Sequence, residues 1–163
     1  ATISRLAWFT AALLYLQLIV GATMRHRGAG LVIQTFPQAT PEGDWLPQTH
    51  NVLVYLNFTH TRIGAMLVTI LVLWLAVRAL GSGSAFTRRP AALLVWLLAA
   101  QITLGVSVVL YGKPLIVTTF HVLNGAALLA LTVLLAARTT RSRESALTAM
   151  TSSRVMESRE ANA

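Results

Sequence analysis

The sequence contains no cysteine, and only 11 % of its 163 residues are charged. Without cysteine, the chain has no disulfides, thiolate metal sites or cysteine nucleophiles. An average soluble domain carries about 25 % charged residues, so a soluble globular enzyme is not expected. Acidic residues are scarce, with 5 against 13 basic ones and a formal net charge of +8. Because 55 % of the residues are hydrophobic, disorder is excluded for most of the length.

Four apolar segments are each long enough to cross a bilayer, which takes about 20 helical residues. They cover residues 6–24, 55–77, 90–110 and 115–137. A soluble helix bundle would show polar stripes along each segment, and these are nearly absent. The sequence therefore predicts an all-α integral membrane four-helix bundle at residues 1–137. A polar, mobile tail is expected at 138–163.

The basic residues divide unequally between the two sides of the expected bundle. Four of them flank its outer connections: Arg25, Arg27, Arg62 and Lys113. Nine lie with the termini and the connection between the second and third segments: Arg5, Arg78, Arg88, Arg89, Arg138, Arg141, Arg143, Arg154 and Arg159. Because basic residues accumulate on the cytoplasmic side, we expect both termini in the cytoplasm and loop 25–54 outside. The charge is thus interpreted as a topology signal, and no nucleic-acid partner is expected.

A short pattern, Gln-x3-Gly followed by His-x3-Gly, occurs twice along the chain. The residues of the two copies are Gln17, Gly21, His60 and Gly64, then Gln101, Gly105, His121 and Gly125. Two spans separate the copies, so both copies have the same topology in the membrane. Parallel repeats are related by an axis along the membrane normal. The pattern predicts two parallel two-helix repeats, with the second and fourth spans across from each other.

His60 and His121 are expected at the same depth in the membrane. Both spans run inward from the outer surface, and the histidines are their sixth and seventh residues. At a rise of 1.5 Å per residue, both lie roughly 8–10 Å below the outer boundary. Ionisable residues inside a membrane usually face the bundle interior. Two such histidines can ligate one metal ion or one haem iron from opposite sides.

The neighbouring residues favour haem over a bare metal ion. Gly64 and Gly125 lie one turn inward of each histidine on the same helix face, and the absence of a side chain leaves room for a flat macrocycle. A structural zinc site takes four ligands, and no Cys, Asp or Glu lies in any span. The alternative is that the glycines and histidines only serve contacts between helices.

Arg62 follows His60 by two residues, and two roles are open for it. Its guanidinium can pair with a haem propionate, or the side chain can extend to the outer lipid head groups. His26 and His50 lie in the outer loop and are expected to be solvated. A hydrolytic site is not expected, because no acid lies within a span to act as a base.

Together these motifs resemble the haem A synthase family, whose members have eight transmembrane helices in two similar four-helix halves. The resemblance is to the C-terminal half and covers residues 6–138. The matching stretches are residues 17–31, 35–37, 45–47, 58–65, 101–105, 112–114 and 117–125.

The resemblance implies that His60 and His121 are the axial iron ligands of a b-type haem that serves electron transfer. In the family, the other half binds haem O and oxidises its C8 methyl group to the formyl group of haem A. This chain departs from the family in two places. Thr61 separates the first histidine from Arg62, where the family often has arginine directly after histidine. The catalytic glutamate of the other half corresponds to Asn57, so oxidoreductase activity of this chain alone stays open.

Three functions are compatible with these observations. The first is a haem A synthase-like membrane protein in cytochrome oxidase cofactor biosynthesis, acting with a second copy or a second homologous half. The second is a b-type electron-transfer or haem-carrying membrane protein without catalysis. The third is a structural subunit of a larger membrane complex. Haem content separates the third from the others, and conversion of haem O to haem A separates the first from the second.

Overall fold

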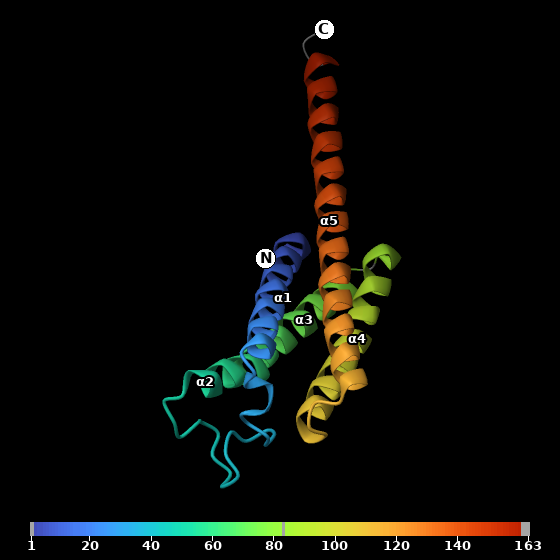
Figure 1. Ribbon diagram of the computed structural model, residues 1–163. Coiled ribbons are helices and arrows are strands. Elements are labelled where there is room, and N and C mark those ends of the chain that lie inside the picture. Colours follow the sequence, from blue (N-terminus) through green and yellow to red (C-terminus); the bar gives the residue numbers. More distant parts are fainter. Residues whose placement is uncertain (1, 83, 161–163) are drawn as a thin grey trace.

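The computed structural model describes residues 2–82 and 84–160, and within these ranges the chain forms helices, turns and loops without a β-strand. The helices occur along the chain in the following order: α1 (Ile3–His26), a 3-10 turn η1 (Ala29–Leu31), α2 (Val52–Phe58), a π-helical turn η2 (Thr59–Gly64), α3 (Ala65–Leu80), α4 (Ala85–Leu110) and α5 (Leu115–Glu160). The predicted all-α fold is thereby confirmed (Figure 1).

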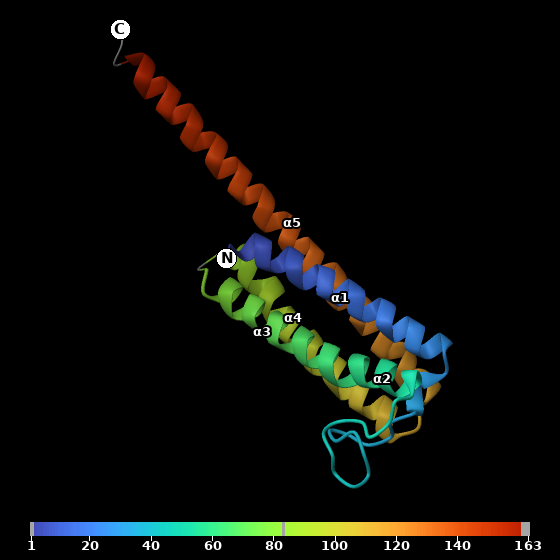
Figure 2. The same cartoon turned by 90° about the vertical axis from the view of Figure 1, so that its left-hand side faces the viewer.

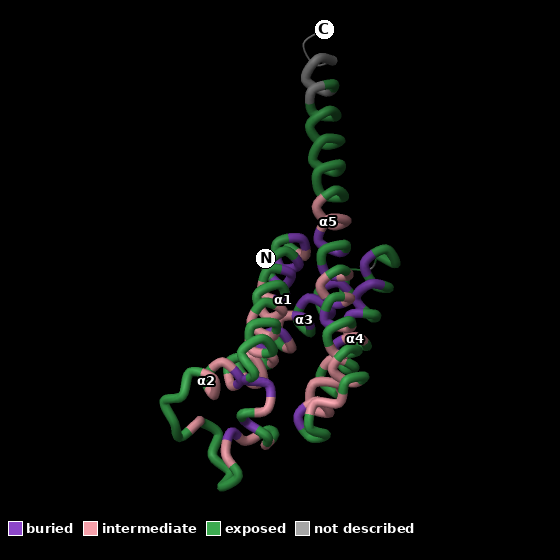
Figure 3. Tube along the Cα trace, in the orientation of Figure 1, coloured by how far each residue is buried: buried purple, intermediate pink, exposed green. Residues whose placement is uncertain are grey.

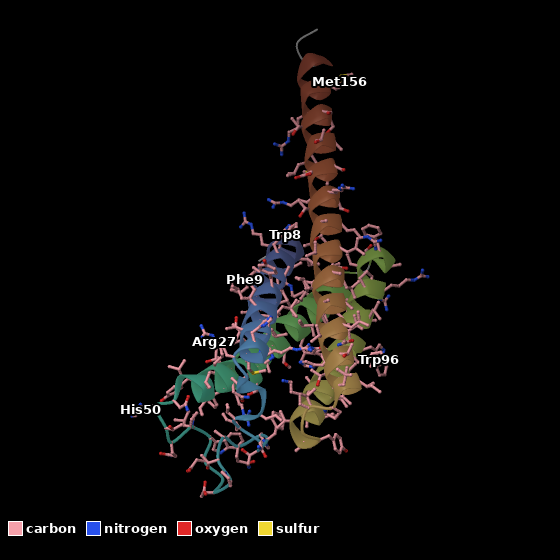
Figure 4. All side chains as sticks on the ribbon, in the orientation of Figure 1. Trp8, Phe9, Arg27, His50, Trp96 and Met156 are labelled. Atoms are coloured by element: carbon pink, nitrogen blue, oxygen red, sulfur yellow. The ribbon has the colours of Figure 1, made fainter. Side chains whose placement is uncertain are left out.

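Four helical stretches are long and apolar enough to cross a membrane. They are α1, the continuous helix Val52–Leu80 formed by α2, η2 and α3, then α4, and the stretch Leu115–Arg154 of α5. Large apolar side chains cover the outer faces, including Phe9 at 63 % and Trp96 at 75 % exposure (Figure 4). Such a surface is unfavourable in water and suits lipid. The chain is an integral membrane protein, as predicted.

Each helix of the bundle packs against two others. α1 lies against α3 and α5, and α4 lies against the same two helices. The second and fourth spans therefore lie diagonally across the bundle (Figures 1 and 2). The relation of the two halves by an axis along the membrane normal stays a prediction.

The densest packing lies in the half of the bundle near the N-terminus (Figure 3). Its fully buried side chains include Val72 and Leu75 of α3, Leu94 of α4, and Leu128 and Leu135 of α5. Alanines at the helix contacts allow the backbones to approach closely, as small residues do in membrane bundles: Ala7, Ala76, Ala79, Ala91 and Ala136. The buried amide and imidazole side chains lie in the other half of the bundle.

Left-handed residues end α1 and form the connection between α4 and α5. Gly28 has φ +69° directly after the cap of α1, a conformation that glycine adopts without strain at helix ends. Gly112 and Lys113 have φ +67° and +64° and turn the chain into α5. This turn brings Lys113 to the first outer loop, where its Nζ lies 3.7 Å from an ideal Cβ position on Gly30.

The polar tail continues α5 as helix. α5 has 46 residues, which corresponds to about 70 Å at 1.5 Å per residue, and it extends well beyond the bundle (Figure 2). Arg138 stacks over Phe86 at 4.8 Å, and Thr140 bonds to Ser4 at 2.6 Å, so the start of the polar stretch contacts the bundle. The domain boundary at 137 and the mobility of the tail stay predictions, and 161–163 lie outside the described residues.

Two neighbouring leucines of α4 test the packing directly. Leu94 is fully buried, whereas Leu93 is 49 % exposed on the outer face. Replacing Leu94 by alanine is expected to lower the free energy of unfolding by about 2–5 kcal/mol, because a cavity remains in the core. Leu93→Ala, the matched control, is expected to change it far less. Denaturant titration in detergent micelles measures both values, and equal losses would mean that α4 is packed through another face.

Candidate functional site

The structure separates the four histidines into an inner pair and two exposed residues. His60 lies on η2 and His121 on α5, and both side chains are partly buried. The Nδ1 atoms of both are buried, and neither has a hydrogen-bond partner among the described residues. His26 and His50 are exposed, and His50 lies on the outer loop away from the bundle (Figure 4). Only the inner pair has the arrangement expected of two ligands.

Each inner histidine ring lies directly against a glycine of the neighbouring helix. An ideal Cβ on Gly21 of α1 would lie 2.7 Å from Cε1 of His60. An ideal Cβ on Gly105 of α4 would lie 3.0 Å from Cε1 of His121. A side chain at Gly21 would force the His60 ring to shift, and one at Gly105 would press on the His121 ring. The Gln-x3-Gly motif thus provides the surface on which the histidine of its own repeat rests.

The glycines that follow the histidines receive the glutamines. The Gln17 amide occupies the space where a Cβ on Gly64 would lie, and Nε2 of Gln101 is 3.2 Å from the same position on Gly125. We expected Gly64 and Gly125 to leave room for a macrocycle, but in this structure glutamine side chains fill that room. In both repeats the two motifs therefore interlock, with histidine on one glycine and glutamine on the other. The role of these glycines beside a haem stays a prediction.

The two copies of the motif differ in their hydrogen bonds. Gln17 donates from Nε2 to the main-chain carbonyl of His60 at 2.7 Å. Gln101 instead places Nε2 at 3.4 Å from Nε2 of His121, and its Oε1 accepts from Asn124 Nδ2 at 2.8 Å. Asn124 was not identified from the sequence. The available signal was a polar residue inside the fourth span, three positions after a histidine.

The helix around His60 is also different from the helix around His121. The residues of η2 form a π-helical turn, whereas His121 lies within regular α-helix. Short π-helical turns inside α-helices occur frequently at functional sites. Sequence patterns do not reveal such a turn, because it adds one residue locally and leaves the apolar character of the span unchanged.

Arg62 holds the outer loop against η2. Its guanidinium donates to the carbonyls of Thr35, Pro37 and Gln38, and to Oγ1 of Thr61 at 2.6 Å. It also lies 5.5 Å from the centre of the Phe36 ring, so the side chain is stacked as well as bonded. In this structure, Arg62 is therefore directed to the loop and not to the lipid head groups. Pairing with a propionate stays a prediction.

Asn57 supports the same loop from one turn earlier. It is fully buried, and its Nδ2 donates to the carbonyl of Ala29 at 2.8 Å. Thr61 donates in turn to the main-chain carbonyl of Asn57 at 2.8 Å. An ionised glutamate has no hydrogen to donate to a carbonyl. The residue that replaces the glutamate of the other half is thus part of the loop support.

A pocket at one end of the bundle lies far from the histidines. A shallow pocket of about 410 Å³ occupies the end of the bundle that carries the N-terminus. It is lined mainly by hydroxyl side chains, with Arg143 from α5. Its lining includes no histidine and no acidic residue. The candidate site is therefore the histidine pair in the polar half of the bundle.

Comparison with known proteins identifies the family. The family model COX15-CtaA, described as cytochrome oxidase assembly protein, matches residues 1–133. The chain belongs to this family. Its role therefore lies in cytochrome oxidase assembly and haem A biosynthesis, in agreement with the haem A synthase resemblance of the sequence motifs. No curated protein and no solved structure matches the chain. The match covers the first three spans of this COX15-CtaA member and the fourth as far as residue 133, and it stops before the polar stretch of α5.

The support of the outer loop by Arg62 can be tested by substitution with lysine. Lysine keeps the charge, but its compact ammonium cannot reach several carbonyls from one planar group. We expect amide hydrogen exchange in residues 35–39 to become about tenfold faster, since hydrogen bonds to a charged group contribute roughly 1.5–3 kcal/mol. Arg27→Lys, at an exposed position, is the control. Equal rates in the two variants would contradict the assigned role of Arg62.

Proposed function

We propose that this chain is a haem A synthase-like membrane protein in which His60 and His121 are the axial ligands of one b-type haem. The observation that carries the proposal is a pair of buried imidazoles on diagonal helices, whose Nδ1 atoms have no partner among the described residues. A buried polar atom without a partner costs about 1–3 kcal/mol. Two imidazoles in one membrane bundle whose ring nitrogens are not fully engaged by the protein are what a site for a ligand would contain.

The residues at the site fit a haem better than a metal ion with protein ligands alone. Within the described ranges, no group of three or more His, Cys, Asp and Glu side chains comes together. Neutral imidazole is an ordinary axial ligand of haem iron, and glycines on α1 and α4 hold both rings in place. A bound haem would supply one-electron redox chemistry. The protein would bind the iron, orient both rings and exclude water with its apolar spans.

Two features favour electron delivery over substrate oxidation at this site. His60 and His121 would both hold the haem iron, and a haem held by two histidines would supply electron transfer rather than oxygen chemistry. The spans contain no acid to take part in proton transfer, and the amide of Asn57 is engaged with the outer loop. We therefore propose that oxidation of the haem O methyl group requires a second homologous half or a second copy of this chain. A b-type electron-transfer protein without catalysis is the alternative.

We propose that both termini are cytoplasmic and that residues 25–54 lie outside. The unequal division of basic residues supports this orientation. Because the chain has no cysteine, single cysteines are clean reporters at the exposed positions Thr49 and Ser142. A membrane-impermeant maleimide should label Thr49→Cys on intact cells and Ser142→Cys only after permeabilisation. The reverse pattern would overturn the orientation.

The ligand assignment predicts distinct spectra for the histidine variants. Purified protein should show the visible spectrum of low-spin haem b, oxidised and reduced. His60→Ala and His121→Ala should each abolish that spectrum, because one axial ligand is lost. His50→Ala, the matched control in the exposed loop, should retain it. A low-spin spectrum in both inner variants would show that other residues bind the iron, and no haem in the native protein would favour a structural subunit.

A glycine variant tests the same site without removing a ligand. Gly105→Ala places a methyl group where the His121 ring lies, so we expect haem binding to weaken although both histidines remain. Gly81→Ala is the control, since its Cβ would meet only main-chain oxygens at 3.4 Å or more. Extracted haem decides between the functions. Haem b alone supports electron delivery, and haem O or haem A supports the synthase reaction by this chain.

A further inference from the structure

A continuous chain of hydrogen bonds leads from the backbone of α4 to the ring of His121. Asn124 Nδ2 donates to the carbonyl of Leu97 at 2.8 Å and to Oε1 of Gln101 at 2.8 Å. Nε2 of Gln101 then lies 3.4 Å from Nε2 of His121. All four residues are partly buried. In such a low-dielectric setting, a polar network is held more firmly than in water.

The backbone carbonyl determines the direction of every bond in this chain. A carbonyl oxygen only accepts, so the atom of Asn124 that faces Leu97 must be the amide nitrogen. That nitrogen also faces Gln101, so the Gln101 atom beside it must be the oxygen. The amide nitrogen of Gln101 is then directed at His121. Because an amide nitrogen only donates, Nε2 of His121 must be the acceptor.

We propose that Asn124 and Gln101 are positioning residues that set the tautomer of His121, with the proton on Nδ1 and the lone pair on Nε2. This inference rests on the proposed function, in which His121 binds haem iron. Iron binds only a nitrogen that carries a lone pair, so the network assigns Nε2 as the ligating atom. The long Gln101 contact holds that lone pair weakly, and iron replaces the amide as its partner.

The first repeat lacks an equivalent chain of hydrogen bonds to its histidine ring. Gln17 uses its amide nitrogen on the main-chain carbonyl of His60 and not on the ring. The position equivalent to Asn124, three residues after the histidine, is Ile63. The two proposed ligands thus have different surroundings: a chain of side-chain amides leads to the His121 ring, whereas the His60 ring packs on Gly21 without such a chain.

Nitrogen NMR of the haem-free full chain in lipid nanodiscs, with 15N-labelled histidine, measures the tautomer directly. The native protein should show His121 with the proton on Nδ1 only. Asn124→Leu releases the Gln101 amide from its orientation, and Gln101→Met removes the donor. In both variants we expect loss of the single tautomer and a mixture of the two. A merely structural role would change stability and leave the tautomer unaltered.

Gln17→Met is the matched control, because it removes an equivalent amide that bonds to a main-chain carbonyl. It should leave the His121 signals as in the native protein. The proposal is overturned if native His121 carries its proton on Nε2 or populates both tautomers, or if Asn124→Leu retains the single Nδ1 form. The native measurement decides even if a variant fails to fold.

The haem-loaded native protein provides the second arm of the test. Electron–nuclear double resonance with 15N-histidine should find Nε2 of His121 on the iron, and coordination through Nδ1 would overturn the assignment. Failure of the native protein to bind any haem would count against the proposed function alone, since the tautomer of the haem-free chain is measured independently. The two proposals therefore fail by different results.

Discussion

The contact between each inner histidine ring and a glycine of the adjoining helix is the constraint on which the polar half of the bundle depends. A Cβ on Gly21 would lie 2.7 Å from the His60 ring and one on Gly105 would lie 3.0 Å from the His121 ring, so a methyl group at either position would push against the imidazole. Because the rings occupy this space, α1 approaches η2 closely and α4 approaches α5 closely. The glutamine one turn away on the same helix then reaches the glycine after the histidine. In each repeat, the histidine ring of one helix thus packs on a glycine of the other, and the glutamine of that other helix packs on the glycine that follows the histidine.

The bundle divides its stability and its chemistry between two ends. Near the N-terminus, leucines and alanines form the apolar core, and the buried hydroxyls of Thr10 and Thr132 donate to main-chain carbonyls of their own helices. Near the outer loop, the helices are joined by amides, imidazoles and one guanidinium. Polar groups inside a membrane are costly unless they are satisfied or functional. Gln17, Asn57 and Arg62 donate to main-chain carbonyls of neighbouring segments, whereas the Nδ1 atoms of the histidine pair have no partner among the described residues. This contrast supports the proposal that the pair is the functional centre.

The two repeats carry the same motif but have different surroundings. Thr61 follows the first histidine where the haem A synthase family often has arginine, and it lies inside a π-helical turn, which has room for an additional residue. Residues two apart on a helix do not share a face, so Arg62 points away from the His60 ring and reaches the loop at 35–38. The second repeat has no such turn and holds its histidine through Asn124 instead. His60 and His121 therefore have different surroundings, although the sequence motif around them is the same.

The sequence by itself determined the four spans, the membrane location and the family, and it predicted the pairing of His60 with His121. These follow from span length, the scarcity of charge and repeated spacing, all of which are local properties of the chain. The neighbours of each side chain were decided only by the tertiary structure. Gly64 and Gly125 receive glutamines, Arg62 binds the loop, and Asn124 orients Gln101. Such partners lie 23 or more residues apart in sequence. Which residues meet depends on the rotation of each helix, on the π-helical turn and on the close approach of the helices at glycine. None of these three leaves a pattern in a single sequence, because each depends on how two helices meet.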